Sequence, residues 1–466
     1  MKKKFRLIIL FTCVALFFLI APYIVMYSMG YRIDPETWEI AATGGIYVRT
    51  YPQADQVTVD SKINKKPGMF ANSIFVQDLM PRQHSVLIKK DGYFDYTKTL
   101  EVKEKEVTKI ENIILFKTDV FYDKLLENTL SFSVSPDKKN ILAEIANTKS
   151  LDFSYFSVSA PKNIKTYSLP LKYTSVLDVK WSDDSNKALI KTYNTTNATA
   201  YYIIDFSKET QQTTPLSYLS ASSENISFNP QDSSQFFYTK NNTLYIVKNS
   251  KATALIKNLL DYKFYNGNIV WLSLDGDLNK SDFTGKTTET LSVWNINKDY
   301  ISPLEYKINI VADKIFLVKS DSLFRYNSET KSLEYLDPRV TNYKLLSSPD
   351  GKNIISYNNS EIYLYNYELS EENKTGEKSV KLFSSNYPET ITNCFWLSND
   401  YIIFETGNKI IISEIDYRGN INAVEVPKNY EPSASSKNPE VFFNSQDNKV
   451  YILNGDILYS SEKLTP

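Results

Sequence analysis

The feature that most constrains this sequence is a strand–turn–strand pattern that recurs eight times from residue 132 onward. Each copy has an apolar or alternating run, a short polar turn such as "SSPDGKN" and a second apolar run, and most are followed by a third run such as "TLYIVK". Copies begin at Phe132, Val179, Ile226, Tyr262, Ile308, Tyr343, Cys394 and Val441, which places them 35 to 51 residues apart. A four-stranded propeller blade takes ~40–50 residues, and one small sheet cannot bury both of its faces alone. The copies are therefore predicted to pack against one another.

Residues 117–466 are accordingly predicted to form a β-propeller of eight blades, or of seven if one repeat is misread. The fourth copy, from Tyr262, carries the weakest signal. The last copy supplies three strands before Pro466, so the segment 117–127 is expected to add the fourth strand and close the ring.

The octapeptide "LSSPDGKN" (346–353) could be an active-site loop or a tight turn. Its repetition as "SVSPDKKN" and "KWSDDSNK" favours the turn, in which Asp350 supplies a short polar side chain and Gly351 tolerates positive φ. The repeats resemble WD40-like and TolB-type propellers, whose inner hairpins often carry Ser-Pro-Asp-Gly-Lys turns. The Trp-Asp and Gly-His signatures of WD40 proteins are absent, so the resemblance favours the looser bacterial type.

Composition supports an all-β fold and excludes some partners. The chain has 34 Tyr and 25 Phe but only 13 Gly, and aromatic residues favour strands. Its 53 basic and 54 acidic residues give a formal charge of −1, which supplies no net field for nucleic acid.

The cysteine and histidine inventory excludes most familiar catalytic chemistry. The two cysteines, Cys13 and Cys394, cannot form a disulfide framework, and with the single histidine, His84, they cannot form a Cys/His zinc site. One histidine also removes most Ser-His and Cys-His mechanisms. We expect His84 to be a surface residue of a strand, and Cys13 to be an inert thiol within a membrane.

The N-terminal 29 residues are predicted to be a basic cytoplasmic tail and a transmembrane signal anchor. Lys2, Lys3, Lys4 and Arg6 precede a stretch from Leu7 to Met29 that has no charged side chain, close to the ~20 residues that cross a bilayer. The basic flank should stay in the cytoplasm and place residues 30–466 on the extracytoplasmic side of the cell membrane. Pro22 is expected to kink or end the helix.

After a spacer (30–43), residues 44–116 are predicted to form a small β-sandwich. Alternation of apolar and polar residues is plain in "QVTVD", "HSVLIKK" and "KTLEVKEKEVTKIENIIL", and it indicates short strands with one buried face.

This stretch resembles the PEGA domain, a bacterial and archaeal extracytoplasmic module. Family members typically open with Ser-x-Pro-Glu-Gly-Ala and then Val-x-Val-Asp, where this chain has Pro52–Asp55 and Val57–Asp60. Leu79–His84 stands for the later Leu-x-Pro-Gly-x-His/Tyr segment, with Arg82 in place of the glycine, and Lys90–Tyr93 matches Lys-x-Gly-Tyr. The resemblance implies an adhesion or surface-attachment part and no catalytic residue.

Two short motifs imitate known sites. Asp275–Asn279 resembles the start of a calcium loop, but its sixth position is Lys280 and its twelfth is Lys286, so a strand-connecting turn is favoured. Ser273 and the two residues after it hint at the Asp box of sialidases but lack its glycine and aromatic residue.

Four tryptophans fall in the repeat region: Trp181, Trp271, Trp294 and Trp396. Trp181 and Trp396 share one repeat position, which predicts packing between blades. Other aromatic residues of the repeats could line a glycan- or peptide-binding surface.

The sequence thus predicts a non-catalytic, membrane-anchored binding or scaffolding protein whose propeller face contacts protein or cell-envelope glycan. No catalytic, cofactor-binding or metal-binding residue is assigned, and the ligand-binding residues stay open. The alternative is an extracytoplasmic propeller enzyme, a carboxylate-dependent hydrolase or lyase, although no Asp/Glu pair stands out. A role as a sensor or assembly partner of an envelope machine is a third possibility.

Overall fold

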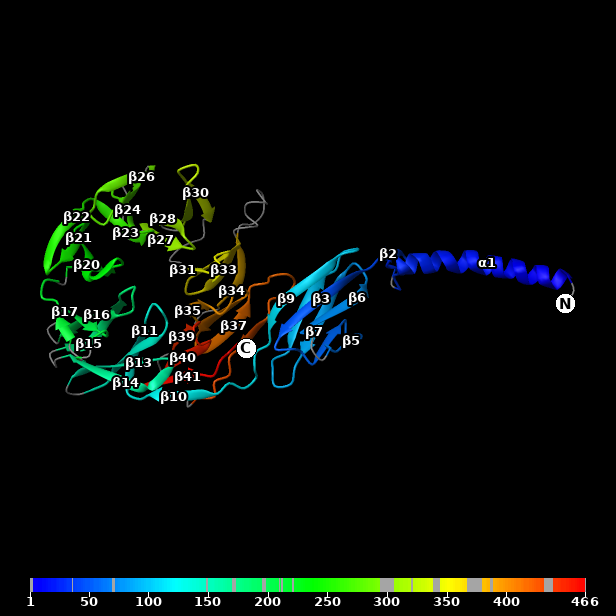
Figure 1. Cartoon of the computed structure of the whole chain (residues 1–466), viewed down its shortest axis with the longest axis horizontal. Helices are drawn as coiled ribbons and strands as arrows, with labels where there is room; N and C mark the ends of the chain where they lie inside the picture. Colours follow the sequence, from blue (N-terminus) through cyan, green and yellow to red (C-terminus); the bar gives the residue numbers. More distant parts are fainter. Residues whose placement is uncertain are drawn as a thin grey trace. The chain divides into compact units, whose positions relative to one another are not determined.

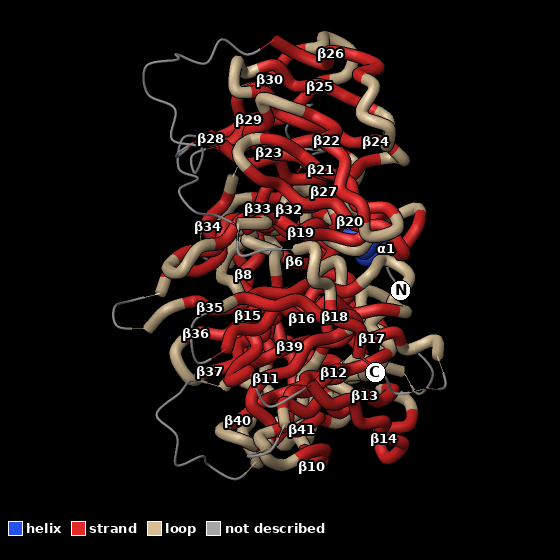
Figure 2. Tube along the Cα trace, turned by 90° about the vertical axis from the view of Figure 1, so that its left-hand side faces the viewer, coloured by secondary structure: helices blue, strands red, loops and turns tan. Residues whose placement is uncertain are grey.

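The structure is a computed structural model. It describes residues 3–35, 37–68, 72–147, 150–169, 173–194, 198–208, 210, 213–219, 222–293, 306–319, 322–337, 344–366, 379–385, 389–430 and 439–465. The chain divides into two compact units, which we call the sandwich unit (Met1–Val120, Ile412–Pro427 and Leu464–Pro466) and the propeller unit (Phe121–Ile411 and Lys428–Lys463). Strands, red in Figure 2, make up most of the chain, and α1 is drawn in blue. The expectation of an all-β protein with one N-terminal helix is confirmed.

The helix α1 spans Lys3–Ser28. Its segment Leu7–Ser28 has the length and composition of a membrane span, and a signal sequence near an N-terminus has the same properties. The helix continues past Pro22 and does not end there, while a kink at Pro22 stays a prediction. A short antiparallel hairpin follows, made of β1 (Tyr31–Ile33) and β2 (Ile40–Ala42).

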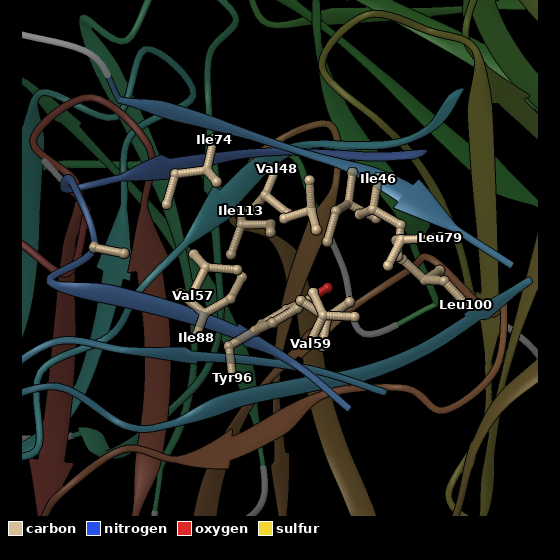
Figure 3. Packing of buried hydrophobic residues seen from close by; sticks show 14 of the residues in the cluster. Ile46, Val48, Val57, Val59, Ile74, Leu79, Ile88, Tyr96, Leu100 and Ile113 are labelled. Carbon is tan, nitrogen blue, oxygen red and sulfur yellow. The ribbon is translucent and has the colours of Figure 1, made fainter. Parts of the chain in front are cut away.

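The sandwich consists of two sheets with the strand orders β5-β4-β7-β8 and β6-β3-β9. Its strands are β3 (Gly44–Tyr51), β4 (Gln56–Val59), β5 (Ile63–Lys65), β6 (Ser73–Leu79), β7 (Gln83–Lys89), β8 (Tyr96–Glu101) and β9 (Val107–Ile114). β3 is antiparallel to β6 and parallel to β9. Alternate side chains of the two sheets meet in one buried core, and Figure 3 shows Val57 and Ile88 on one side facing Val48 and Ile113 on the other.

From residue 122 on, the described part of the chain forms eight four-stranded sheets, seven of them consecutive meanders (Figure 1). The first strands are β10 (Tyr122–Leu126), β11 (Thr129–Val134), β12 (Asn140–Ile145), β13 (Leu151–Ser157), β14 (Ala160–Leu169), β15 (Tyr173–Trp181), β16 (Lys187–Asn194), β17 (Thr199–Asp205), β18 (Thr213–Pro215), β19 (Glu224–Asn229), β20 (Asp232–Lys240), β21 (Thr243–Lys248) and β22 (Lys251–Ile256). They continue with β23 (Leu259–Tyr265), β24 (Asn268–Ser273), β25 (Asp277–Ser281), β26 (Thr287–Val293), β27 (Tyr306–Val311), β28 (Lys314–Lys319), β29 (Ser322–Asn327), β30 (Ser332–Asp337), β31 (Lys344–Ser347), β32 (Asn353–Tyr357), β33 (Glu361–Asn366), β34 (Val380–Ser384), β35 (Ile391–Trp396), β36 (Tyr401–Thr406), β37 (Lys409–Glu414), β38 (Ala423–Glu425), β39 (Glu440–Asn444), β40 (Lys449–Asn454) and β41 (Ile457–Ser461).

The remaining sheet joins the two ends of the repeat region, in the order β10-β41-β40-β39. Strand β10 precedes the first repeat and pairs antiparallel with β41, the last strand of the chain (cyan beside red in Figure 1). The expectation that a strand from 117–127 completes the last sheet is therefore confirmed.

Each sheet packs on the next, and the last packs on the first. Buried clusters join β11–β14 to β15–β18 and so on through β31–β34, and another joins β11–β13 to β40 and β41. Phe383 contacts Phe404 and Phe395 contacts Phe442, which links the remaining neighbours. This closed cycle of sheets is the packing of a β-propeller.

The octapeptide 346–353 forms the turn between β31 and β32. The backbone N–H of Asn353 donates to Ser348 Oγ at 3.0 Å, and Ser348 Oγ donates to Asp350 Oδ1 at 2.6 Å. Gly351 follows at φ 74°. The side chains are thus used inside the turn, and the interpretation as a turn is confirmed.

The same turn recurs in the first two repeats. Ser135 Oγ accepts from the Asn140 N–H and donates to Asp137 Oδ1. Ser182 Oγ likewise accepts from the Lys187 N–H and donates to Asp184 Oδ1. Lys138 at φ 60° and Ser185 at φ 59° take the position of Gly351 in these turns. Of these three turns, only that of the sixth repeat uses glycine, the residue that adopts positive φ without strain.

Two substitutions at positive φ should change stability in opposite directions: Gly351→Ala in the β31–β32 turn and Ala312→Gly in the β27–β28 turn. Gly351→Ala should lower the free energy of unfolding by about 1 kcal/mol, because L-residues disfavour positive φ. A Cβ there would lie 3.8 Å from Ala312 Cβ, so no clash adds to the cost. Ala312, at φ 51°, is the matched control: Ala312→Gly should stabilise by up to about 1 kcal/mol. Chemical unfolding measures both, and equal signs would contradict the argument.

Candidate functional site

His84 lies inside the sandwich and not on its surface, so that expectation is wrong. It is 3% exposed, because it shares the inward phase of β7 with Val86 and Ile88. Its Nδ1 is 2.6 Å from Asp60 Oδ2 and its Nε2 is 2.7 Å from the carbonyl of Met80. Through these two contacts His84 ties two loops of the sandwich together.

The pKa of Asp60 follows from this contact. Burial raises it, but hydrogen bonds from the His84 ring and from the Ser85 backbone outweigh burial, and the pKa lies below its usual value. Asp60 therefore stays ionised and stabilises the sandwich above pH ~4, and this stabilisation is lost as the pH falls below that range.

The tryptophans that share a repeat position do hold neighbouring sheets together. Trp181 Nε1 donates to Ser133 Oγ at 2.9 Å, and Trp396 Nε1 donates to the carbonyl of Leu346 at 3.2 Å, each in the preceding sheet. Trp271 donates instead to Ser281 of its own sheet. Trp294 lies outside the described residues. The prediction of packing between blades is confirmed for Trp181 and Trp396.

The calcium-like stretch connects strands. Asp275 lies in the turn between β24 and β25, Asp277 begins β25, and Ser273 Oγ accepts a hydrogen bond from the Asp277 backbone. Across the described residues, no group of three His, Cys, Asp or Glu side chains is arranged to hold a metal ion.

A groove of ≈ 500 Å³ lies between the sheets β23–β26 and β27–β30. Its apolar lining is Val270, Leu291 and Ile315, which belong to the buried core that joins these sheets. The rest is lined by two tyrosines, two uncharged polar residues and a set of charged residues. They are Tyr265, Tyr326, Asn327, Ser328, Lys280, Glu289, Asp313, Lys314, Arg325, Glu329 and Lys331.

Two ion pairs involve residues that line this groove. Lys331 Nζ lies 2.9 Å from Glu289 Oε1, and Arg325 Nη2 lies 2.7 Å from Glu334 Oε2. The hydrogen bond from Lys331 lowers the pKa of Glu289, and Glu289 in turn raises the pKa of Lys331. Glu289 is therefore ionised at neutral pH and is unsuited to act as a general acid. The groove offers charged and hydrogen-bonding groups above an apolar floor, which suits binding.

A second cluster of ionisable groups is buried in the sandwich unit. Lys98 on β8 is fully buried, with Nζ 2.6 Å from Glu414 Oε1 and 2.5 Å from the carbonyl of Asp416. Glu414 also accepts from Tyr96 OH at 2.8 Å and from the backbone of Asn422 at 2.9 Å. Lys and Glu side chains in such proximity can perform catalysis, but here each is enclosed and hydrogen-bonded, so the cluster is structural.

Loop residues of the same segment complete the edge of β8. Asn420 Oδ1 accepts from the Thr99 N–H at 2.9 Å, and Asn420 Nδ2 donates to the Thr97 carbonyl at 2.7 Å. Asn422 Oδ1 accepts from the Thr97 N–H at 3.1 Å. These amides replace a neighbouring strand. Nothing local in the sequence relates residues 97–99 to residues 414–422, so sequence reasoning missed this contact.

Glu405 on β36 is a buried carboxyl with a raised pKa. It is 2% exposed, and burial raises its pKa to about 7, although Thr392 Oγ1 donates to its Oε2 at 2.5 Å. Its Oε1 has no hydrogen-bond partner among the described residues. Glu405 does not line the groove between β23–β26 and β27–β30.

The fold thus defines a β-propeller joined to a small β-sandwich. Residues 43–114 match the sequence model of the PEGA domain, and this segment is a PEGA domain. A comparison with curated protein sequences gave no match.

Solved structures similar to the chain include a Moraxella catarrhalis protein, a propeller and a lyase. BamB from Moraxella catarrhalis is 12% identical with a TM-score of 0.45, and the alignment covers 73% of this chain and 98% of BamB. The Dos1 propeller is 8% identical with a TM-score of 0.48, covering 74% and 94%. Virginiamycin B lyase from Staphylococcus aureus is 12% identical with a TM-score of 0.38, covering 74% and 99%. At these identities the likeness concerns the fold alone.

We expect the Lys98–Glu414 pair to be strongly coupled. Lys98→Met should lower the free energy of unfolding by ~3–5 kcal/mol, because it leaves a buried carboxylate without its cation. The double variant Lys98→Met/Glu414→Leu should lose less than the sum of the single variants. Tryptic cleavage after Arg418, which Asp416 holds in an ion pair, reports release of the loop. Additive losses would show that the two groups act independently.

Glu405 should make stability decrease as the pH rises. A raised folded-state pKa means that the native protein keeps its proton, so this stabilisation is complete below pH ~4.5 and is lost as the pH passes through about 7. One pKa unit corresponds to about 1.4 kcal/mol, so the loss amounts to a few kcal/mol. Glu405→Gln should flatten this part of the pH–stability curve, measured by urea unfolding from pH 5 to 8. An unchanged slope would contradict the assignment.

Proposed function

We propose that this chain is a non-catalytic, membrane-anchored binding or scaffolding protein. In this proposal, α1 remains in the cell membrane and the PEGA domain and the propeller lie on the extracytoplasmic side. The groove between β23–β26 and β27–β30 then contacts a partner protein or a cell-envelope glycan.

The observation that carries the proposal is the chemistry of the groove. Paired charges, two tyrosines and an apolar floor give a partner both hydrogen bonds and contact area. A hydrolase or lyase of the carboxylate type would need one carboxyl held protonated near a second, ionised one. Glu289 has a lowered pKa, which argues against that role for it.

Site-specific photo-crosslinking tests this proposal. A photo-crosslinking phenylalanine analogue replaces Tyr326, which lines the groove, in the full chain in native membranes. The matched control is the same replacement at Tyr335, which lies on β30 of the same sheet and is 47% exposed. We expect one defined adduct from position 326 and none from position 335.

Digestion of the adduct separates the two partner classes, because a protease shortens a protein partner and a glycan hydrolase shortens a glycan. Equal adducts from both positions, or none from position 326, would remove the support for the groove. Conversion of the captured molecule by the purified protein would instead favour the enzyme.

A further inference from the structure

The hairpin β1–β2 exposes an apolar surface directly after α1. Ile33 and Ile40 are cross-strand partners, so they lie on one face of the hairpin, and they are 49% and 56% exposed. Trp38, in the turn between the strands, is 80% exposed. A tryptophan this exposed leaves a large apolar area in water, which disfavours the isolated protein.

The backbone of Trp38 adds a second cost. Its φ is 61°, a conformation that bulky L-residues rarely adopt. Its N–H donates to the carbonyl of Asp34 at 2.8 Å, which fixes the turn. Asn or Gly would suit this position better if only the turn mattered, so the turn by itself does not account for a tryptophan here.

The polar groups of the hairpin point the other way, into the sandwich unit. Arg32 Nη2 lies 2.8 Å from Asp78 Oδ1 on β6, and Asp34 Oδ1 lies 3.8 Å from Arg82 Nη1. These ion pairs hold the hairpin on the sandwich while the Ile33–Ile40 pair stays uncovered. The hairpin is therefore amphipathic, with a fixed orientation on the PEGA domain side.

The hairpin is also held at the end of α1. Arg32 Nη1 donates to the carbonyl of Tyr27 at 2.7 Å, and its guanidinium lies 3.5 Å from the centroid of the Tyr27 ring. The carbonyl of Gly30 accepts from both the N–H and Oγ1 of Thr43 at 2.8 Å. Strand β1 therefore turns back beside the last helical turn.

The lengths of α1 and of strand β1 limit how far from the bilayer the apolar surface of the hairpin can lie. The segment Leu7–Ser28 has 22 residues, enough for the ~30 Å hydrocarbon core. The headgroup layers bring a bilayer to ~40–45 Å, and a three-residue strand spans at most ~10 Å. A hairpin that turns back at the end of a spanning α1 stays within reach of this layer, where tryptophan is favoured.

We propose that the β1–β2 hairpin is a second membrane contact, in which Trp38, Ile33 and Ile40 insert into the headgroup layer of the phospholipid bilayer. This inference rests on the proposed membrane anchor. The bilayer covers the apolar face and offsets the strained turn, and the PEGA domain is thereby held at the lipid surface.

Quenching by brominated lipid tests the contact. The full chain and Trp38→Phe are reconstituted into phosphatidylcholine vesicles with and without bromine on the upper part of the acyl chains. The emission difference between the two proteins isolates Trp38 from the other four tryptophans. We expect this difference signal to be blue-shifted and to be lost in the brominated vesicles.

Trp181→Phe is the control, because that indole is hydrogen-bonded between two propeller sheets and its difference signal should be the same in both vesicles. Trp38→Gly checks folding, and we expect its unfolding temperature to be no lower than that of the unchanged chain. Flotation of the vesicles reports the anchor separately. If the chain floats but the Trp38 signal is not quenched, the hairpin proposal is overturned and the anchor stands. If the chain does not float, both are overturned.

Discussion

The pairing of β10 with β41 is the constraint on which the propeller depends. Four-stranded sheets of this size cannot fold alone, since each must bury both faces against neighbours. The chain supplies three strands for the last sheet, β39 to β41, and the fourth comes from before the first repeat. The register Tyr122↔Ser461 brings the two ends of the propeller unit together and completes the cycle of packed sheets.

The propeller could be predicted from the sequence because its turns and strands follow local, repeating patterns. Contacts between residues far apart in the sequence could not be predicted in this way. The turn at Ser348–Asn353 is encoded within six residues, and it repeats, so its role followed without coordinates. His84 alternates with Val86 and Ile88 along β7, and this local pattern is sufficient to predict a ring that points into the sandwich. The partner Asp60 was not foreseeable from pattern alone, because it comes from another strand connection.

Long-range polar contacts lie beyond such reasoning. Lys98 shares the inward phase of β8 with Tyr96 and Leu100, but alternation alone does not supply the partners that a buried lysine needs. It is fully buried because Glu414 and Asp416 reach it from more than 300 positions away. Hydrogen bonds to Glu414 and to the Asp416 carbonyl offset the cost of burying the Lys98 ammonium, and no local sequence pattern predicts them. The groove is likewise a product of packing, since its lining comes from two repeats that each look ordinary by themselves.

The two ion-pair sites differ in what their charges can do. Lys98 and Glu414 are buried and multiply hydrogen-bonded, so exchanging either partner for an outside ligand would leave an unpaired charge in a dry interior. Lys331 and Glu289 are 62% and 42% exposed, and an exposed pair of this kind contributes only ~0–1 kcal/mol. A partner that offers its own carboxylate, amide or hydroxyl groups can therefore replace this pair at little cost. Both pairs consist of a lysine and a glutamate, so the difference between them is solvent exposure. The buried Lys98–Glu414 pair maintains the fold, and the exposed Lys331–Glu289 pair is available for binding.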